Sequence, residues 1–322
     1  MRLMVLFLAL LLTAFLPAVA QAPKAAQASK AAQAKQTPEG DPVITLDVVR
    51  VPLLYTVSDK KGRFVSDLKK EDFEVLESKR TQNILEFSAE SDLPLRLAVL
   101  IDTSNSQRER FKFQQEAATD FVGAMIRAKT DKAAIVSFDT SAELVADLTD
   151  DTGVLSSAIR SLRPGGGTAL YDAVFFACRD KLSLDKPSYK FRRAMVILSD
   201  GDDNQSRYTR DQALELAHKA DVVIYTISTN ISRIETPGDK VLRYLAQETG
   251  GLAFFPFKSQ ELAQSFENIA NELRHQYALL YRPEPLKLDG QYHAVDVKVK
   301  NRKDLQVRVR RGYYAEQGAL EQ

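Results

Sequence analysis

Nearly continuous apolar runs, separated by segments with a helical period, most constrain how this chain of 322 residues can fold. Runs of this kind are typical of parallel strands that are covered on both faces, because no position in such a strand faces water. They cover residues 95–101, 133–138, 194–198, 222–227 and 252–255. The chain therefore has the strands that a buried parallel sheet requires.

The segments between these runs have the spacing of helices. One carries apolar residues four positions apart, at Phe113, Ala117, Phe121 and Met125. A later segment begins at Ser259, an expected N-cap, and has its apolar residues at Leu262, Phe266, Ile269 and Leu273. Strands that alternate with helices predict an α/β fold with an open, doubly wound, mostly parallel sheet.

Strand patterns without helices flank this region on both sides. Residues 43–87 and 277–309 alternate apolar with polar side chains, which predicts half-buried antiparallel strands. Each flank alone is too small to bury a stable core. We therefore expect residues 42–92 and 276–315 to join into one β-sandwich, with residues 93–275 inserted as the α/β domain.

A basic stripe on the last expected strands includes Arg308 and Arg310, which alternate with valines. This alternation predicts the solvated face of a sheet, and an anionic partner is the alternative interpretation.

The N-terminus has the layout of an export signal. Arg2 precedes an apolar core over residues 3–16, and Ala18 and Ala20 form a small-residue cleavage site. We expect cleavage after Ala20 and a periplasmic or secreted protein without a transmembrane segment; an uncleaved inner-membrane anchor is the alternative. Residues 21–41 are rich in Ala, Gln, Lys and Pro, which predicts a flexible linker.

Composition excludes several classes of function. A net charge of +1 gives no basic field, so we expect no nucleic-acid partner. The one cysteine, Cys178, excludes an intramolecular disulfide, and its apolar surroundings predict a buried thiol. His218, His275 and His293 have no spacing that suggests a catalytic triad or a zinc site.

Oxygen-bearing residues follow the expected strands at three places. Asp102, Ser104 and Ser106 come directly after the first run, Thr168 ends a glycine-rich loop before an expected helix over 169–178, and Asp200 follows the third run. Ligands of a doubly wound sheet bind beyond the carboxyl ends of its strands. Each segment alone is typical of a turn or a helix cap. Together their carboxylates and hydroxyls suit a hard divalent cation such as Mg²⁺.

These residues, in this order, resemble a von Willebrand factor A domain over residues 95–275. Residues 102–106, Asp-Thr-Ser-Asn-Ser, match the family's Asp-x-Ser-x-Ser motif, Thr168 its loop threonine and Asp200 its third-loop aspartate. The flanks resemble exported bacterial proteins of the VWFA-related, acidobacterial type, through Phe-Val-Ser-Asp-Leu at 64–68, Glu-Asp-Phe-Glu-Val at 71–75 and Arg-Gly-Tyr-Tyr at 311–314.

The resemblance implies a metal-ion-dependent adhesion site and not a catalyst. Mg²⁺, with Mn²⁺ or Ca²⁺ as alternatives, would be held by Asp102, Ser104, Ser106, Thr168 and Asp200, and an Asp or Glu of a protein partner would complete the coordination. The alternative function is a structural component of an envelope complex, in which the metal stabilises the fold.

Two enzyme classes fit the residues poorly. A phosphotransferase with Asp102 as nucleophile would want a second acid at position 104, which is Ser104. The glycine-rich loop lacks the Lys-Ser/Thr end of a phosphate-binding P-loop.

Overall fold

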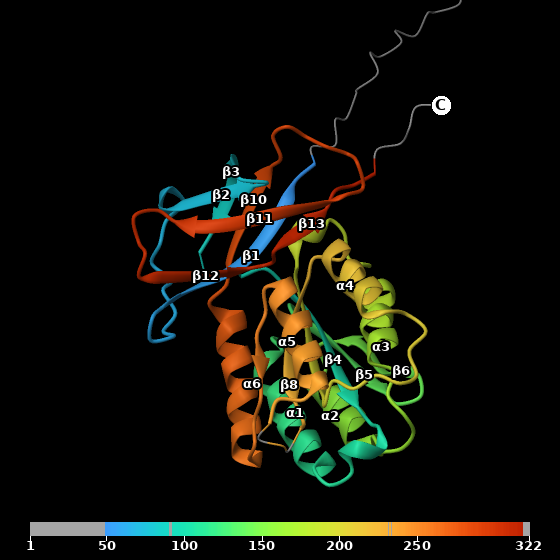
Figure 1. Ribbon diagram of the computed structural model, residues 1–322. Coiled ribbons are helices and arrows are strands. Elements are labelled where there is room, and N and C mark those ends of the chain that lie inside the picture. Colours follow the sequence, from blue (N-terminus) through green and yellow to red (C-terminus); the bar gives the residue numbers. More distant parts are fainter. Residues whose placement is uncertain (1–48, 90–91, 231, 233, 318–322) are drawn as a thin grey trace, which may run out of the picture. The chain divides into compact units, whose positions relative to one another are not determined.

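The computed structural model describes residues 49–89, 92–230, 232 and 234–317 (Figure 1). The expected signal segment, residues 1–20, and the expected linker, residues 21–41, lie outside the described residues. Among the described residues, none of the helices has the length and apolar character that crossing a membrane requires.

One sheet has six strands in the order β6-β5-β4-β7-β8-β9. Their bounds are β4 Leu95–Asp102, β5 Lys132–Phe138, β6 Ala142–Thr149, β7 Arg192–Ser199, β8 Val222–Ser228 and β9 Ala253–Phe254. The neighbours β5-β4-β7-β8-β9 pair in parallel, and β6 pairs antiparallel with β5 at the edge. All the strands expected in this region are present. The edge strand β6 was not predicted, because its side chains are mostly half-buried and form no continuous apolar run.

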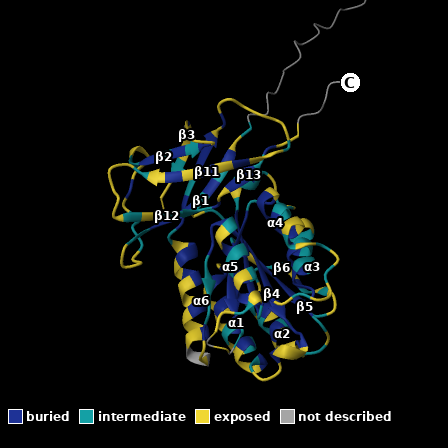
Figure 2. Cartoon of the chain, in the orientation of Figure 1, coloured by how far each residue is buried: buried dark blue, intermediate teal, exposed yellow. Residues whose placement is uncertain are grey.

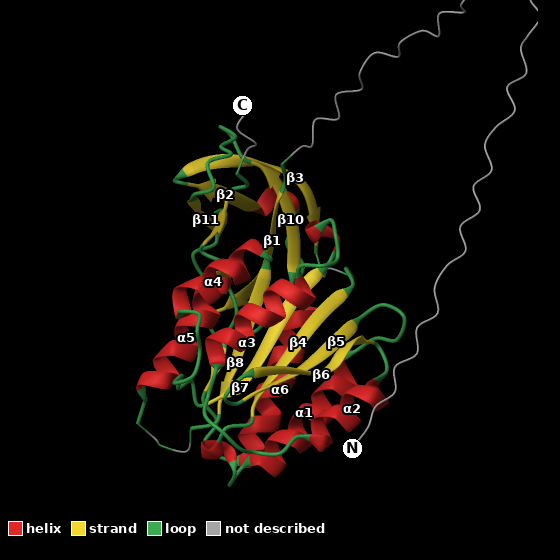
Figure 3. Ribbon diagram, turned by 90° about the vertical axis from the view of Figure 1, so that its right-hand side faces the viewer, coloured by secondary structure: helices red, strands yellow, loops and turns green. Residues whose placement is uncertain are grey.

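Helices cover both faces of this sheet (Figure 3). On one face lie α1 Phe111–Met125, α2 Thr152–Ser161 and α6 Ser259–Arg274, and on the other lie α3 Leu170–Ala177, α4 Arg210–Lys219 and α5 Pro237–Thr249. The inward faces of the helices and the strands between them are buried (Figure 2). Short turns complete the fold at η1 Lys70–Asp72, η2 Asn105–Gln107, the π-helical η3 Cys178–Leu182 and η4 Ser188–Lys190. The doubly wound architecture predicted from the sequence is confirmed.

Two local expectations about helices were wrong. The N-cap of α6 is Lys258, and Ser259 is the first helical residue. In α1 the buried stripe contains Gln114, whereas Phe113 is 50% exposed. The four-residue spacing was right for Phe121 and Met125, which are buried, and wrong for Phe113, which lies in the first turn of the helix.

The flanks form a second sheet, of seven strands in the order β12-β1-β10-β3-β2-β11-β13 (Figure 1). Their bounds are β1 Val51–Asp59, β2 Phe73–Glu77, β3 Arg80–Ser88, β10 Tyr277–Arg282, β11 Tyr292–Val299, β12 Leu305–Val309 and β13 Gly312–Tyr314. All the pairings are antiparallel, and they interleave strands of the two flanks. The sheet curls, so that β12 also contacts β11, and it encloses an apolar core that includes Tyr55, Phe73 and Tyr277.

The expected β-sandwich is therefore met in part. The two flanks join and share one core, but they do so within a single hydrogen-bonded, curled sheet.

The basic stripe is not simply a solvated face. Arg308 Nη2 donates to Glu272 Oε1 of α6 at 2.6 Å, and the Glu272 side chain is almost completely buried. Arg310 is itself buried and donates to Asp221 Oδ1 at 2.6 Å and to the Pro52 carbonyl at 2.8 Å. Both arginines tie strand β12 or its end to other elements, so this part of the prediction was wrong.

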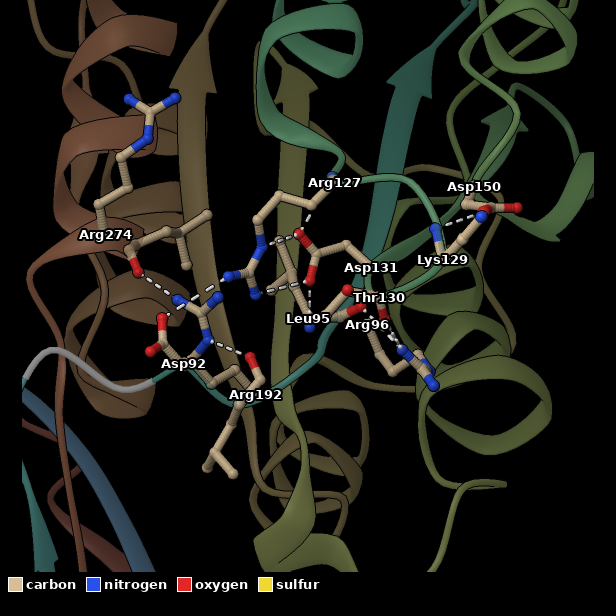
Figure 4. Close-up of polar contacts among 12 residues, drawn as sticks. Asp92, Leu95, Arg96, Arg127, Lys129, Thr130, Asp131, Asp150, Arg192 and Arg274 are labelled. Carbon is tan, nitrogen blue, oxygen red and sulfur yellow. Dashed lines mark hydrogen bonds and ion pairs between the residues drawn. The ribbon is translucent and has the colours of Figure 1, made fainter.

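Arginine contacts also fix the amino ends of the parallel strands (Figure 4). Arg127 donates from Nε to Asp131 Oδ2 at 2.8 Å, and the Leu95 amide donates to Asp131 Oδ1 at 2.8 Å. Burial alone would raise the pKa of Asp131, but these hydrogen bonds outweigh it and hold that pKa below its ordinary value. Arg192 donates to the carbonyls of Leu93 and Leu273. The acidic and basic groups at this end of the sheet therefore satisfy one another.

Candidate metal centre

The centre begins where two neighbouring parallel strands end. Asp102 is the last residue of β4 and Ser199 the last of β7. Ser199 Oγ donates to Asp102 Oδ2 at 2.6 Å, and the Ser104 amide donates to Asp102 Oδ1 at 2.9 Å. Burial raises the pKa of Asp102 to about 6, although the hydrogen bonds from Ser104 and Ser199 favour the carboxylate. The structure thus holds this carboxylate in a fixed orientation inside the protein.

The loops after β4 and β7 bring three oxygen-bearing side chains together. Ser104 Oγ lies 3.0 Å from Ser106 Oγ. Ser106 Oγ donates to Asp200 Oδ2 at 2.6 Å. The Asp102 carboxylate accepts from the Ser104 amide and so belongs to the same group. Four of the five predicted ligands are therefore connected by hydrogen bonds.

Thr168 joins this group through its loop. The Thr168 amide donates to Asn204 Oδ1 at 3.0 Å, and its carbonyl accepts from the amides of Asn204 and Gln205. The same glycine-rich loop is tied to the first loop, since the Gly165 amide donates to the Thr103 carbonyl at 2.6 Å. Thr168 is buried, and α3 is capped by Ala169 instead of Thr168. All three predicted loops are thus hydrogen-bonded to one another.

Glycine is required directly after Asp200. Gly201 has a φ of +82°, and a Cβ added there would lie 2.2 Å from the Gly238 carbonyl oxygen. A Cβ on Gly238 would in turn lie 2.2 Å from the Asp200 carbonyl oxygen. The first turn of α5 therefore packs directly against the backbone that carries Asp200.

Sequence reasoning missed a buried pair of amides beneath the site. Gln107 Nε2 donates to Ser106 Oγ and to Asp200 Oδ2, each at 3.0 Å. Gln114 Nε2, on α1, donates to Gln107 Oε1 at 3.0 Å. Gln107 follows the matched motif directly, but only the observation that Gln114 is 1% exposed distinguishes the pair from ordinary surface glutamines.

The centre has negative charge without a basic partner. Within the described part of the chain, neither Asp102 nor Asp200 lies within ion-pair distance of a lysine, arginine or histidine. The pKa of Asp202 is raised, first by burial and then by the charges of Asp200 and Asp239. The amino ends of the strands differ, because the Asp131 carboxylate there is paired with Arg127.

The donor set fits a hard divalent cation. It has carboxylates and hydroxyls only. The described residues contain no group of three His, Cys, Asp or Glu side chains that could hold a metal ion, so a site here depends on the hydroxyls as well as on the carboxylates. Neighbouring ligands of octahedral Mg²⁺ lie about 2.9 Å apart, since each lies 2.0–2.1 Å from the ion. The Ser104–Ser106 oxygen separation of 3.0 Å agrees with such an edge. The full ligand set of five residues stays a prediction.

Comparisons with known proteins agree with this fold. The family model of the von Willebrand factor type A domain matches residues 97–202. An uncharacterized protein of Borreliella burgdorferi is 28% identical over 130 residues, which is 39% of this chain and 36% of that protein. The match therefore spans little more than a third of that relative.

Solved structures similar to this chain have low sequence identity to it. Proximal thread matrix protein 1 from the mussel byssus, with a zinc-occupied MIDAS motif, is 17% identical with a TM-score of 0.50, covering 61% of this chain and 49% of that one. The vWF domain of the type V pili tip protein Mfa5 from Porphyromonas gingivalis is 16% identical with a TM-score of 0.47, covering 56% and 94%. The family match over residues 97–202 and the doubly wound sheet together support a von Willebrand factor A domain in this part of the chain.

Proposed function

We propose that this chain is an exported protein-binding module whose binding depends on a divalent metal, with Mg²⁺ as the resident ion. Asp102, Ser104, Ser106, Thr168 and Asp200 hold the ion directly or through water. A glutamate or aspartate of a partner protein completes its coordination. In this proposal the protein catalyses no reaction.

One observation carries the proposal. Carboxylates and hydroxyls of the loops after β4 and β7 meet at the ends of these strands, with no basic side chain of the described residues within ion-pair distance of Asp102 or Asp200. A cation placed there gains favourable interactions that nothing in the described protein supplies. The zinc-occupied MIDAS motif of the mussel protein supports metal binding by this fold.

The ligand types support capture of an acidic group. Neutral hydroxyls leave a bound Mg²⁺ with more positive character than an all-carboxylate shell would, so it attracts a further anionic oxygen. Asp102 keeps both of its oxygens in hydrogen bonds with Ser199 and Ser104, which favours its contact with the ion through water.

The histidines support a role in binding and not in catalysis. His218 and His275 lie on or at the end of α4 and α6, and His293 contacts Glu77 and Asp289 in the seven-stranded sheet. None of these three histidines contacts the candidate centre, so the centre has no nearby general base of this kind.

Titration calorimetry with Mg²⁺ tests the site. We expect the wild-type chain to bind one ion, and Asp102→Ala to weaken that binding at least tenfold, because it removes a charged ligand. Asp120→Ala, an exposed acid on α1, is the matched control and should bind as the wild type does. Equal affinity in Asp102→Ala and the wild type would contradict the site.

A second measurement separates binding from simple stabilisation. If the ion takes part in binding, a chelator should abolish capture of an acidic peptide by the wild-type chain under conditions where the chain stays folded. Unchanged capture together with a lowered melting temperature would favour the structural role instead.

A further inference from the structure

A hollow opens directly beside the candidate metal oxygens. Its cavity volume is about 200 Å³. It is lined by Ser106, Gln107, Glu109, Arg110, Asp200, Thr229 and Asn230. Two of the predicted metal ligands, Ser106 and Asp200, therefore form one wall, and the loop after β8 forms the other.

Two further hollows share walls with this one. Arg110 and Thr229 also line a small hollow whose other walls include Phe113 and Pro256. Asn230 also lines a hollow of about 160 Å³ that includes Phe257. The surface is thus continuous from the metal oxygens to the start of α1 and to the segment before α6.

Large aromatic side chains are exposed at the far side of this surface. Phe113 is 50% exposed and Phe257 is 45% exposed. The two segments that carry them are tied together, because Arg110 Nη2 donates to the Phe257 carbonyl at 2.5 Å. Exposed aromatic surface is unfavourable in water and is typical of binding sites when it lies in a patch with a polar rim. We call Arg110, Phe113 and Phe257 the apolar rim.

The hollow beside the metal oxygens has both acidic and basic side chains, whereas the small hollow beside Phe113 has only the basic Arg110 and Lys258. Arg110 has no carboxylate within ion-pair distance among the described residues, and Arg108 donates only to Asn105 Oδ1. Glu109 and Asp200 are the acidic side chains that line the hollow beside the metal oxygens. Unpaired guanidinium groups attract anionic partners and accelerate their approach.

We propose that the apolar rim binds an aromatic or aliphatic side chain that lies within a few residues of the partner's metal-binding aspartate or glutamate. The inference rests on the proposed function, since it names the partner class of the same site. The partner segment is an acidic peptide with an apolar neighbour, and the rim adds specificity that the metal alone lacks.

A peptide selection in Mg²⁺ tests this inference. The probe is a random dodecapeptide library, offered to the wild-type chain, to Phe113→Ser/Phe257→Ser, and to Leu184→Ser as a control. Leu184 is 64% exposed and lines none of these hollows, so the control loses similar apolar surface elsewhere. All three positions are exposed enough that the variants should fold.

We expect the wild type and the control to select peptides that have an acidic residue with an apolar neighbour. The double variant should still select the acidic residue but not the apolar one, and it should bind a wild-type-selected peptide roughly tenfold more weakly. Apolar enrichment that persists in the double variant overturns the inference. The inference is also overturned if light scattering shows that the wild type is a dimer and the double variant a monomer, because a second copy of the chain would then cover the apolar rim.

The same selection distinguishes a failure of the proposed function from a failure of the rim inference alone. If the wild type in Mg²⁺ selects no acidic residue, or if Asp102→Ala selects it equally well, the metal-dependent capture itself is wrong. If acidic selection depends on Asp102 but no apolar neighbour is selected by the wild type, only the rim inference is wrong.

Discussion

At the scale of single residues, the candidate centre depends on side chains that are not ligands. Gln107 donates to both Ser106 and Asp200, and Gln114 fixes the orientation of Gln107 from α1. An amide held in this way keeps an aspartate and a serine at one mutual distance before the ion arrives. Groups that orient metal ligands typically change affinity when they are removed.

Gln107→Leu should therefore weaken Mg²⁺ binding about tenfold, because Asp200 and Ser106 lose their shared donor. Gln114→Leu should weaken it less, since Gln107 keeps its contacts but loses its own anchor. Titration calorimetry measures both. Gln264→Leu, on the exposed side of α6, serves as the control. An affinity for Gln107→Leu equal to that of the wild type would show that the amide does not position the ligands.

A second prediction at this scale concerns pH. Burial, and then the charge of Arg310, lowers the pKa of His218 to about 4, whereas an unfolded histidine titrates near 6.5. Between these values the unfolded chain binds a proton that the folded chain does not. The free energy of unfolding should therefore decrease as pH falls from about 6.5 to about 4, by up to about 3 kcal/mol.

Urea denaturation at several pH values checks this dependence. His218→Leu removes the group and should flatten the slope between about pH 6.5 and pH 4. The same slope in the variant and the wild type would mean that other groups cause the acid sensitivity.

At the scale of elements, buried ion pairs connect the helices of one sheet to the strands of the other. Glu272 of α6 accepts from Arg308 of β12 and from Thr56 of β1, and it has almost no contact with water. Arg310, just after β12, is bound to Asp221, which follows α4. Breaking one partner of a buried pair leaves a charge without compensation, so these contacts hold the elements in place.

Arg308→Met should lower the free energy of unfolding by about 3 kcal/mol, because it leaves Glu272 buried and unpaired. Arg308→Met/Glu272→Met should recover most of that loss, since no charge then remains buried. Arg302→Met breaks the exposed pair with Asp304 and should cost much less stability, because solvent screens an exposed pair. Equal losses in Arg308→Met and Arg302→Met would contradict this account.

At the scale of the whole molecule, the interleaved flanks make the described part cooperative. The described residues form one compact unit, because strands from before and after the α/β region alternate within one sheet. Unfolding that sheet releases both ends of the α/β region at once. Elements coupled in this way are expected to unfold together.

Scanning calorimetry should therefore show one transition for this unit, and not separate transitions for the two sheets. Mg²⁺ at about a hundred times its dissociation constant should stabilise the folded state by about 2.7 kcal/mol and shift that single transition upward. Asp102→Ala should show no such shift. Two resolved transitions, with only one of them sensitive to Mg²⁺, would show that the sheets unfold independently.

The sequence by itself determined the features that depend on local pattern. Apolar runs and helical periods predicted the parallel sheet and its helices, because a strand that is buried on both faces has apolar residues at nearly every position. Asp102, Ser104, Ser106, Thr168 and Asp200 could be proposed together, since parallel strands end at the same edge.

Only the tertiary structure decided which side chains meet when they are far apart in the chain. Burial of Gln114 and exposure of Phe113 depend on where α1 sits, and not on the spacing of apolar residues. The partners of Arg308 and Arg310 lie on other elements, so alternation with valines could not reveal them. The curled single sheet likewise depends on pairing between the two flanks, which is a long-range choice that no local pattern records.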